Sequence, residues 1–227
     1  MRPALLLVVL VAPLGAQEKP HRFAPKKERE AFLLKMEKKM ARVRSFVADF
    51  DQEKTLTVFK NPVKSSGVIL FSKTGQLRWE IKKPFRSILI VDGTSVAKFE
   101  YVGGKRRKLE LGRARDAILL AMEQVRSWFK GDFDRKGKQY EVNVVLEPAP
   151  LIVLTPRSKA MRKSLGALEF SPSEDLTGMR RVTIREKAGK TVMIFKNRKD
   201  GITPPANAFS LKNPAELDSK KLRATAK

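Results

Sequence analysis

The chain has 227 residues, 42% of them hydrophobic, which is enough for one domain with a buried core. Its formal net charge of +24 bears on partners and solubility rather than on fold. There is no Cys, which excludes disulfides and thiolate metal sites, and the one His, His21, argues against a His-based catalytic or metal site.

The first sixteen residues, MRPALLLVVLVAPLGA, are typical of a secretory signal peptide. Arg2 supplies a positive start, an apolar run too short to span a bilayer follows, and small residues end at Ala16. We therefore expect residues 1–16 to be removed on export. Because Gln17 follows instead of the Cys of a bacterial lipoprotein, no lipid anchor is expected. Residues 17–26 are polar and predict a flexible leader.

An amphipathic helix is predicted from about residue 27 to 44. One of its faces carries apolar side chains spaced four, four and three residues apart, namely Phe32, Met36, Met40 and Val43. The period then changes to two, because Phe46, Ala48 and Phe50 alternate with Val47, Asp49 and Asp51. This alternation predicts a half-buried strand.

Further short strands follow, separated by turn signals such as Asp92-Gly93 and Gly103-Gly104. We expect them at residues 67–72, 76–82, 86–91 and 95–102. Strands joined this tightly must be antiparallel, because a parallel pair needs a long crossover. In the strand 76–82, alternation places Leu77, Trp79 and Ile81 on one face and Arg78, Glu80 and Lys82 on the other.

A second helix is predicted within RARDAILLAMEQVRSWFKGD, where Ile118, Met122, Val125 and Phe129 share a face and Gly131 is a helix stop. Strand patterns then resume at 140–146, 151–154, 167–170, 180–186 and 191–196. A short third helix is expected near residues 157–163. The polar residues 212–227 predict a loose, basic tail.

These elements predict one domain of the α+β class, mainly β: a single curved antiparallel sheet, an unclosed barrel, with helices covering its concave apolar face. Its inward apolar side chains can line a ligand cavity or form an ordinary core, and periodicity does not choose between the two. The candidates for lipid binding are Met36, Met40, Phe46, Phe50, Leu77, Trp79, Ile81, Ile118, Met122, Val125, Val182 and Ile184.

Catalysis finds no support in the sequence, because no arrangement of nucleophile, base or carboxylate pair can be nominated. We expect a protein that is not an enzyme and holds no cofactor or metal. Basic clusters at 105–108 and 156–164 lack the interleaved aromatic residues of nucleic-acid binding. They fit either a solvated face or a surface for anionic lipid.

Several segments in order resemble the periplasmic outer-membrane lipoprotein carrier (LolA-like) family. They are SFVADFDQ, SGVILFSKTGQLRWEIKKPFRSILIVDGTS, LIVLTPRS and KDGITPPANAFSL. The resemblance implies a carrier domain over residues 27–211 that shelters the acyl chains of lipoproteins, or a related lipid, between the inner and outer membranes. Its implied partners are acylated lipoproteins, an inner-membrane releasing complex and an outer-membrane acceptor, and it implies a periplasmic monomer that binds no nucleic acid.

The sequence departs from the family at two places. The family's turn before the Trp strand usually carries Arg-Pro, whose Arg holds the helical lid closed, whereas Lys73 and Thr74 stand here. Lys73 is therefore the candidate lid contact, with the charge of Arg but without its planar fork of donors. After Asp92-Gly93 the usual aromatic pair is replaced by Ala97 and Lys98. The alternative function is a non-catalytic envelope-interaction module that docks a basic face on anionic lipid or on a protein partner.

Overall fold

The computed structural model describes residues 22–133 and 138–226. The expected signal peptide and residues 17–21 of the expected leader, which include His21, lie outside these described residues. Within the described part of the chain, no helix is both long enough and apolar enough to cross a membrane.

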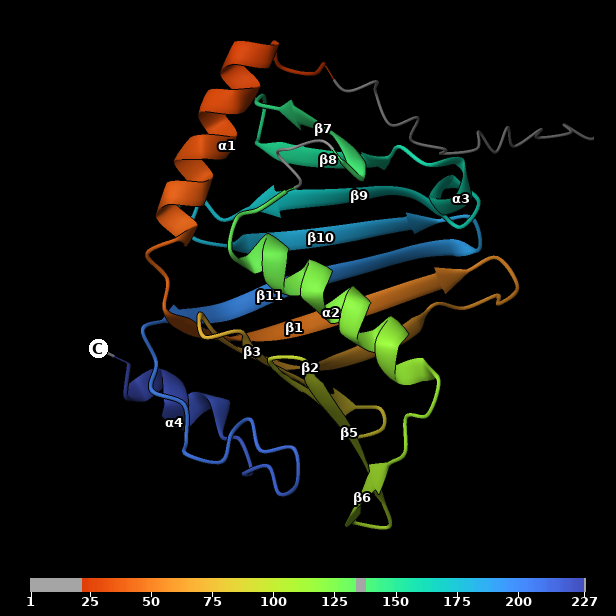
Figure 1. Cartoon of the computed structure of the whole chain (residues 1–227), viewed down its shortest axis with the longest axis vertical. Coiled ribbons are helices and arrows are strands. Elements are labelled where there is room, and N and C mark those ends of the chain that lie inside the picture. The colour runs from red at the N-terminus through yellow and green to blue at the C-terminus, as the bar shows by residue number, and fades with distance from the viewer. Residues whose placement is uncertain (1–21, 134–137, 227) are drawn as a thin grey trace, which may run out of the picture.

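Within the described residues, one antiparallel sheet of eleven strands forms the body of the molecule (Figure 1). The strand order is β6-β5-β4-β3-β2-β1-β11-β10-β9-β8-β7, so β6 and β7 are the two edges and the sheet does not close. This confirms the predicted fold class. The strands are β1 (Ser45–Leu56), β2 (Val63–Ser72), β3 (Gln76–Lys83), β4 (Ser87–Asp92), β5 (Ser95–Val102), β6 (Lys105–Leu109), β7 (Tyr140–Val145), β8 (Leu151–Pro156), β9 (Leu165–Pro172), β10 (Met179–Glu186) and β11 (Gly189–Asp200).

Two long helices lie against one face of this sheet (Figure 1). The helix α1 (Lys26–Met40) leads into the central strand β1, and it ends four residues earlier than predicted. The helix α2 (Ala114–Phe129) joins β6 to β7, so it crosses the sheet from one edge strand to the other. The short helices are α3 (Lys159–Arg162) and α4 (Ser219–Ala224). We call the face under α1 and α2 the concave face and the opposite one the convex face.

Alternation along each strand separates the two faces. On β3, Leu77 packs in the core of the concave face, as predicted, whereas Arg78 and Glu80 point to the convex face. The neighbouring strands β2 and β3 approach each other closely at Gly67, where a Cβ atom would lie 1.9 Å from the carbonyl oxygen of Glu80. Any larger residue at this position would push β2 and β3 apart.

A second hydrophobic core covers the convex face, where the sequence analysis predicted only a loose tail. Residues 201–226, here called the C-terminal strap, fold back over β1 to β5 and include the helix α4. The expectation of a loose tail over residues 212–227 is therefore wrong for the described residues. The strap packs through its apolar side chains, because the strands below it present a buried apolar surface; the core comprises Val47, Val68, Leu70, Ile88, Ile90, Ala97, Phe99, Ile202, Ala208, Phe209, Leu217 and Leu222.

The segment Lys105–Leu109 is the edge strand β6, which the sequence analysis described only as a basic cluster. Pairing with β5 defines it, since Tyr101 lies opposite Arg106 and Val102 opposite Lys105. Residues 105–108 are four consecutive cations, so apolar and polar side chains do not alternate there. The periodicity of the sequence therefore could not predict this strand. Charged residues are common on edge strands, where they discourage pairing with another chain.

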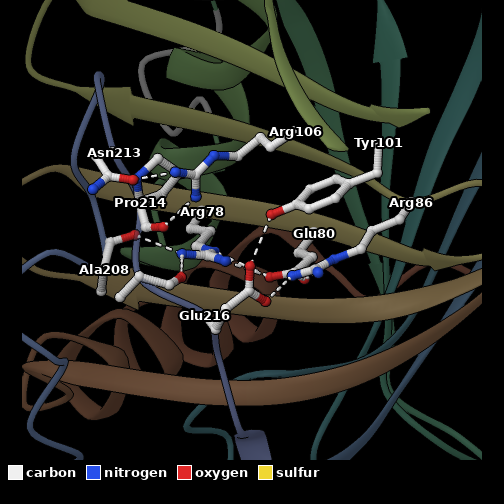
Figure 2. A network of polar contacts seen from close by, with 10 residues as sticks. Arg78, Glu80, Arg86, Tyr101, Arg106, Ala208, Asn213, Pro214 and Glu216 are labelled. Atoms are coloured by element: carbon white, nitrogen blue, oxygen red, sulfur yellow. Dashed lines mark hydrogen bonds and ion pairs between the residues drawn. The ribbon is translucent and has the colours of Figure 1, made fainter. Parts of the chain in front are cut away.

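Arg78 and Glu80 form an ion pair under the strap, with both side chains 0% exposed (Figure 2). Glu80 accepts hydrogen bonds from Arg78 at 2.6 Å and from Arg86 at 2.7 Å. Arg78 also donates to the carbonyl oxygens of Ala208, at 3.0 Å, and Ala215, at 2.6 Å, both in the strap. Because a buried guanidinium without partners is costly, Arg78 requires the strap to stay in place.

Around this buried pair, more exposed groups extend the network to the rim of the strap (Figure 2). Glu216 pairs with Arg86 and accepts a hydrogen bond from the Tyr101 hydroxyl at 3.0 Å. The Arg86 guanidinium lies 4.0 Å from the centre of the Tyr101 ring, and Arg106 donates to the carbonyl oxygen of Pro214 at 2.7 Å. The strap is thus bound to β3, β5, β6 and the β3–β4 turn by charge-assisted hydrogen bonds.

Replacing Arg78→Met is expected to lower the free energy of unfolding by about 3–5 kcal/mol, because it leaves the Glu80 carboxylate and two strap carbonyl groups buried with fewer partners. Urea unfolding followed by circular dichroism measures this loss. The matched control is Arg107→Met on the exposed side of β6, for which a change within about 0.5 kcal/mol is expected. Equal stability of the two variants would show that the strap does not depend on Arg78.

Glu216 makes the stability of the strap depend on pH. Burial would raise the pKa of its carboxyl, but hydrogen bonds from Arg86 and Tyr101 and the charges of Arg86 and Arg78 lower it below its ordinary value of 4.5. The stabilisation is therefore present above the unfolded pKa and is lost as the pH falls through the folded pKa. The difference in unfolding free energy between wild type and Glu216→Gln should be larger at about pH 6 than at about pH 3. A difference that stays constant over this range would contradict the role of the Glu216 charge.

Candidate functional site

The concave face is the candidate site, and its surface is built from aromatic and aliphatic side chains. Phe46 and Phe71 stack with ring centres 5.3 Å apart, and Phe129 of α2 meets Phe46 edge-on at 5.2 Å. Phe50 and Trp79 lie 4.9 Å apart on neighbouring parts of the sheet. Aromatic pairs of this kind stabilise the fold beyond the apolar area that they bury. We call this layer of aromatic side chains beneath α2 the aromatic floor.

Most of the side chains nominated from the sequence meet on this face. Those fully buried in its core are Met36, Met40, Phe46, Phe50, Leu77 and Val182. Those partly buried against it are Trp79, Ile81, Met122, Val125 and Ile184. Ile118 is half-buried on α2 and lies outside this cluster. Whether these residues contact a lipid remains a prediction.

Other members of the same core were not nominated. Phe71 and Phe170 stand in strands whose alternation could have placed them on the inner face. Trp128 packs against Phe170 at 4.7 Å, one position along the helix from the predicted stripe. Phe133 follows the end of α2 and is fully buried, and no periodic signal marked it. The core is thus richer in aromatic rings than the sequence analysis predicted.

A cleft of about 1400 Å³ opens between α1, α2 and the edge strand β7. Its outer wall is polar and carries charges of both signs, among them Arg29, Glu37 and Glu123. Its inner wall includes Leu33 and Tyr140, which also belong to the concave core. The cleft therefore leads from solvent to the apolar face beneath the helices.

Cationic side chains hold α2 to the rim of the sheet. Arg126, whose side chain is 12% exposed, donates from Nη1 to the carbonyl oxygens of Gly75, at 2.5 Å, and Gly93, at 3.1 Å. These glycines lie in the β2–β3 and β4–β5 turns. Arg115 donates to Thr94 in the second of these turns at 3.0 Å. One guanidinium thus spans two hairpin turns from the helix above them.

The helix α1 is held in the same way. Lys73, the candidate lid contact, donates from Nζ to the carbonyl oxygen of Ala41, which caps the C-terminal end of α1, at 2.7 Å. Lys39 donates to the carbonyl oxygen of Asp175, in the β9–β10 turn, at 2.8 Å. A cation at this end of a helix also offsets its partial negative charge. In addition to these polar contacts at the rim, the buried apolar side chains of α1 pack in the core of the concave face.

Asp175 stiffens the turn that receives Lys39. Burial alone would raise the pKa of its carboxyl, but hydrogen bonds from Ser173 and Thr177 lower it below the ordinary value. The carboxylate accepts from the Ser173 hydroxyl at 2.6 Å and from the Thr177 hydroxyl at 2.9 Å. The turn is therefore an ordered anchor for α1.

The two helices touch at Gly131, just after the end of α2. Its φ of +82° favours glycine, and a Cβ atom there would lie 3.0 Å from the Cα atom of Glu37 and 3.4 Å from the side chain of Met40. Any side chain at this position would separate α1 from α2. Within the described residues, neither helix begins with a side-chain cap hydrogen bond.

Two observations bear on chemistry at the site. Trp128 has a buried Nε1 that finds no hydrogen-bond partner among the described residues, so the core holds an unused donor. Among the same residues, no group of three or more His, Cys, Asp or Glu side chains could hold a metal ion.

The fold and the site define a class of protein: an open antiparallel sheet with an apolar face roofed by two helices. The model of the family described as outer membrane lipoprotein carrier protein LolA matches residues 41–212, and the chain belongs to this family. A curated relative, the outer-membrane lipoprotein carrier protein of Dechloromonas aromatica (strain RCB), is 40% identical over 53 residues. That match covers 23% of this chain and 26% of the relative.

Solved structures with a related outline share little sequence with this chain. A DUF1329 family protein from Desulfovibrio piger has a TM-score of 0.44 and 10% identity, with 82% of this chain and 97% of that one covered. A LolA superfamily protein from Nitrosomonas europaea has a TM-score of 0.42 and 10% identity, over 80% and 97%. The lipoprotein LppX of Mycobacterium tuberculosis has a TM-score of 0.42 and 7% identity, over 77% and 96%.

Replacing Arg126→Met is expected to free α2 from the rim, because two backbone carbonyl groups lose a charged donor worth about 1.5–3 kcal/mol. Hydrogen exchange of the α2 amides should become faster, while exchange in β10 and β11 stays unchanged. Arg126→Lys should recover only part of the protection, because Lys lacks the planar fork with which Arg126 holds the two carbonyl groups through Nη1 and Glu123 through Nη2.

The control for this experiment is Arg113→Met, an exposed residue at the start of the same helix. It removes an equal charge without touching either turn, so α2 exchange should match that of wild type. If Arg113→Met and Arg126→Met accelerate exchange equally, net charge rather than the Arg126 contact holds the helix.

Proposed function

We propose that this protein is a periplasmic carrier that shelters the acyl chains of lipoproteins, or of a related lipid, between the concave face and the helices α1 and α2. The observation that carries the proposal is the combination of an apolar, aromatic floor with a helical roof that is tied to the sheet rim by cation–carbonyl hydrogen bonds. Membership of the lipoprotein carrier family supports it.

The physical need for such a carrier follows from the hydrophobic effect. Each CH₂ group removed from water is worth about 0.8 kcal/mol, so exposing a long acyl chain costs on the order of 10 kcal/mol. A lipoprotein can therefore leave a bilayer only if an apolar surface replaces the lipid around its chains. Sheltering a chain requires no bond to be made or broken, so we propose a carrier without enzymatic activity.

Cargo entry would require the roof to move, because the protein's own side chains fill the concave core in this structure. We propose that release of Arg126 and Lys73 from their carbonyl partners lets α2 and α1 lift away, with entry through the cleft between them. Met36, Met40 and Met122 suit a surface that repacks around chains of different shape. Trp128 Nε1 would then have a carbonyl oxygen of the cargo as its acceptor.

The wider role is the one implied by the family. We propose that residues 1–16 direct export, that the protein acts as a monomer in the periplasm, and that an inner-membrane complex loads it and an outer-membrane acceptor unloads it. The alternative role, docking of a basic face on anionic lipid, is compatible with carriage, because it would use exposed cations and leave the hydrophobic concave core to the cargo.

Uptake of a fluorescent fatty-acid analogue tests the proposal. Wild type should bind the analogue, and Trp79→Asp or Met122→Asp should weaken binding at least about tenfold, because each places a charge against the apolar face. Both residues are only partly buried, so folding can be verified by circular dichroism before binding is measured. The matched control is Val58→Asp, which makes the same kind of change at an exposed turn.

The possible results of these uptake measurements distinguish between the alternatives. Lost uptake in both site variants with normal uptake in Val58→Asp supports a ligand on the concave face. A folded wild-type protein that takes up no analogue would contradict the carrier function, and folded site variants that bind as well as wild type would move the ligand to another surface.

A further inference from the structure

The strand pairing gathers one set of turns at one end of the sheet. The β1–β2, β3–β4 and β5–β6 hairpins and the β10–β11 turn all lie there, because neighbouring strands are antiparallel and in register. We call the turns 57–62, 84–86, 103–104 and 187–188, with α3, the hairpin end. In Figure 1 the β1–β2 and β10–β11 turns and α3 lie together, at the end opposite α1.

Large apolar side chains are exposed at the tips of these hairpins. In the β1–β2 turn Val58 is 81% exposed and Phe59 57%, and in the β3–β4 turn Phe85 is 83% exposed. Val102, beside the β5–β6 turn, is 68% exposed. These side chains lie on separate hairpin tips and do not form a groove. Each of them can therefore enter a fluid layer, such as the headgroup region of a bilayer, independently of the others.

The β1–β2 hairpin also projects beyond its neighbour. Val63 pairs with Lys54, whereas the last pair between β2 and β3 joins Ser66 to Lys83. Three residues of β2 therefore extend past the end of β3, which carries the hairpin tip roughly 10 Å further out. In Figure 1 the β1–β2 turn extends furthest at this end of the sheet.

Cations surround these tips and carboxylates are missing from the same segments. The stretches 57–65, 82–87, 102–108, 156–164 and 187–190 contain no Asp or Glu. Their exposed cations are Lys60, Lys64, Lys82, Lys83, Lys105, Arg107, Lys108, Arg157, Lys159, Arg162, Lys163, Lys187 and Lys190. On the flanking strands, Glu53 and Glu186 already pair with Lys64 and Lys54.

The connections at the other end of the sheet are mixed in charge. They carry Asp92, Glu147, Glu174 and Asp175 as well as the exposed Arg42 and Arg44, and Lys73 is held there by the end of α1. Carboxylates thus accompany the cations at this end, whereas the hairpin-end segments contain cations alone. A directional distribution of this kind orients a protein in an external field, whereas a uniformly basic surface does not.

We propose that the hairpin end docks on an anionic phospholipid bilayer, with Phe59 and Phe85 entering the headgroup region and the surrounding Lys and Arg side chains contacting the lipid charges. Exposed aromatic tips flanked by cations match the two attractions of a membrane surface, apolar burial and the negative surface potential. Lysine stems extend along the apolar layer while their ammonium groups stay at the headgroups. The inference goes beyond carriage, since it concerns a surface away from the concave face.

Vesicle flotation with the purified protein tests this proposal. Vesicles of phosphatidylglycerol and phosphatidylcholine are compared with vesicles of phosphatidylcholine alone, at low and at high salt. Wild type should float with the anionic vesicles at low salt and much less at high salt, because salt screens the attraction. At low and at high salt alike, the protein should bind the neutral vesicles much less than it binds the anionic vesicles at low salt.

Two pairs of substitutions locate the surface. Lys60→Gln with Lys83→Gln should weaken binding to anionic vesicles about twenty-five-fold, since each cation contributes roughly a factor of five. The control pair, Lys27→Gln with Lys35→Gln on the exposed side of α1, removes equal charge and should bind almost as wild type does. Phe59→Ser with Phe85→Ser should weaken binding at high salt most, and Phe23→Ser, an exposed aromatic residue before α1, is its control.

Several results would overturn the proposal: no flotation of wild type, equal flotation with neutral vesicles, or equal effects of the Lys60/Lys83 and Lys27/Lys35 pairs. The test is independent of the proposed carrier function. The hairpin-end variants should take up the fatty-acid analogue normally in vesicle-free buffer, and Met122→Asp should float as wild type does, so failure of either proposal is seen separately.

Discussion

The buried ion pair of Arg78 and Glu80 is the contact on which the two-sided architecture depends. Its side chains point to the convex face, and Arg78 finds its remaining partners in the carbonyl groups of the C-terminal strap. Because a guanidinium at this depth cannot go without acceptors, strap and sheet form one unit. The apolar side chains of the strap then keep water from the outer faces of β1 to β5.

The concave face is covered through a different kind of contact. There the helices rest on an aromatic floor, and their polar attachments are at the rim, where Arg126 and Lys73 reach backbone carbonyl groups. Water can replace these hydrogen bonds at the rim at a lower cost than it can replace the contacts of Arg78, whose side chain is fully buried. The same sheet thus has a cover that is fixed and a cover whose attachments are replaceable, which is the arrangement that a carrier of apolar chains needs.

Much of this architecture could be predicted from alternation and helical periodicity, and the misses have physical causes. Alternation correctly grouped Leu77 with Trp79 and Arg78 with Glu80, but a period cannot tell whether a face is open to water or covered by distant residues. The strap has no period of its own, so its packing arises only from the surface below it. Arg126 lies on a helix whose apolar stripe was predicted, yet its acceptors, Gly75 and Gly93, come from turns far away in the sequence.

The central claim is that the concave face holds acyl chains, and the most direct measurement is mass spectrometry of what accompanies the protein when it is purified from a bacterial periplasm. The account predicts acyl material, a lipoprotein or a lipid, released on denaturation of wild type and absent from a folded Met122→Asp variant. A folded wild-type protein that carries no acyl material, or a variant that carries as much of it as wild type, would contradict the account.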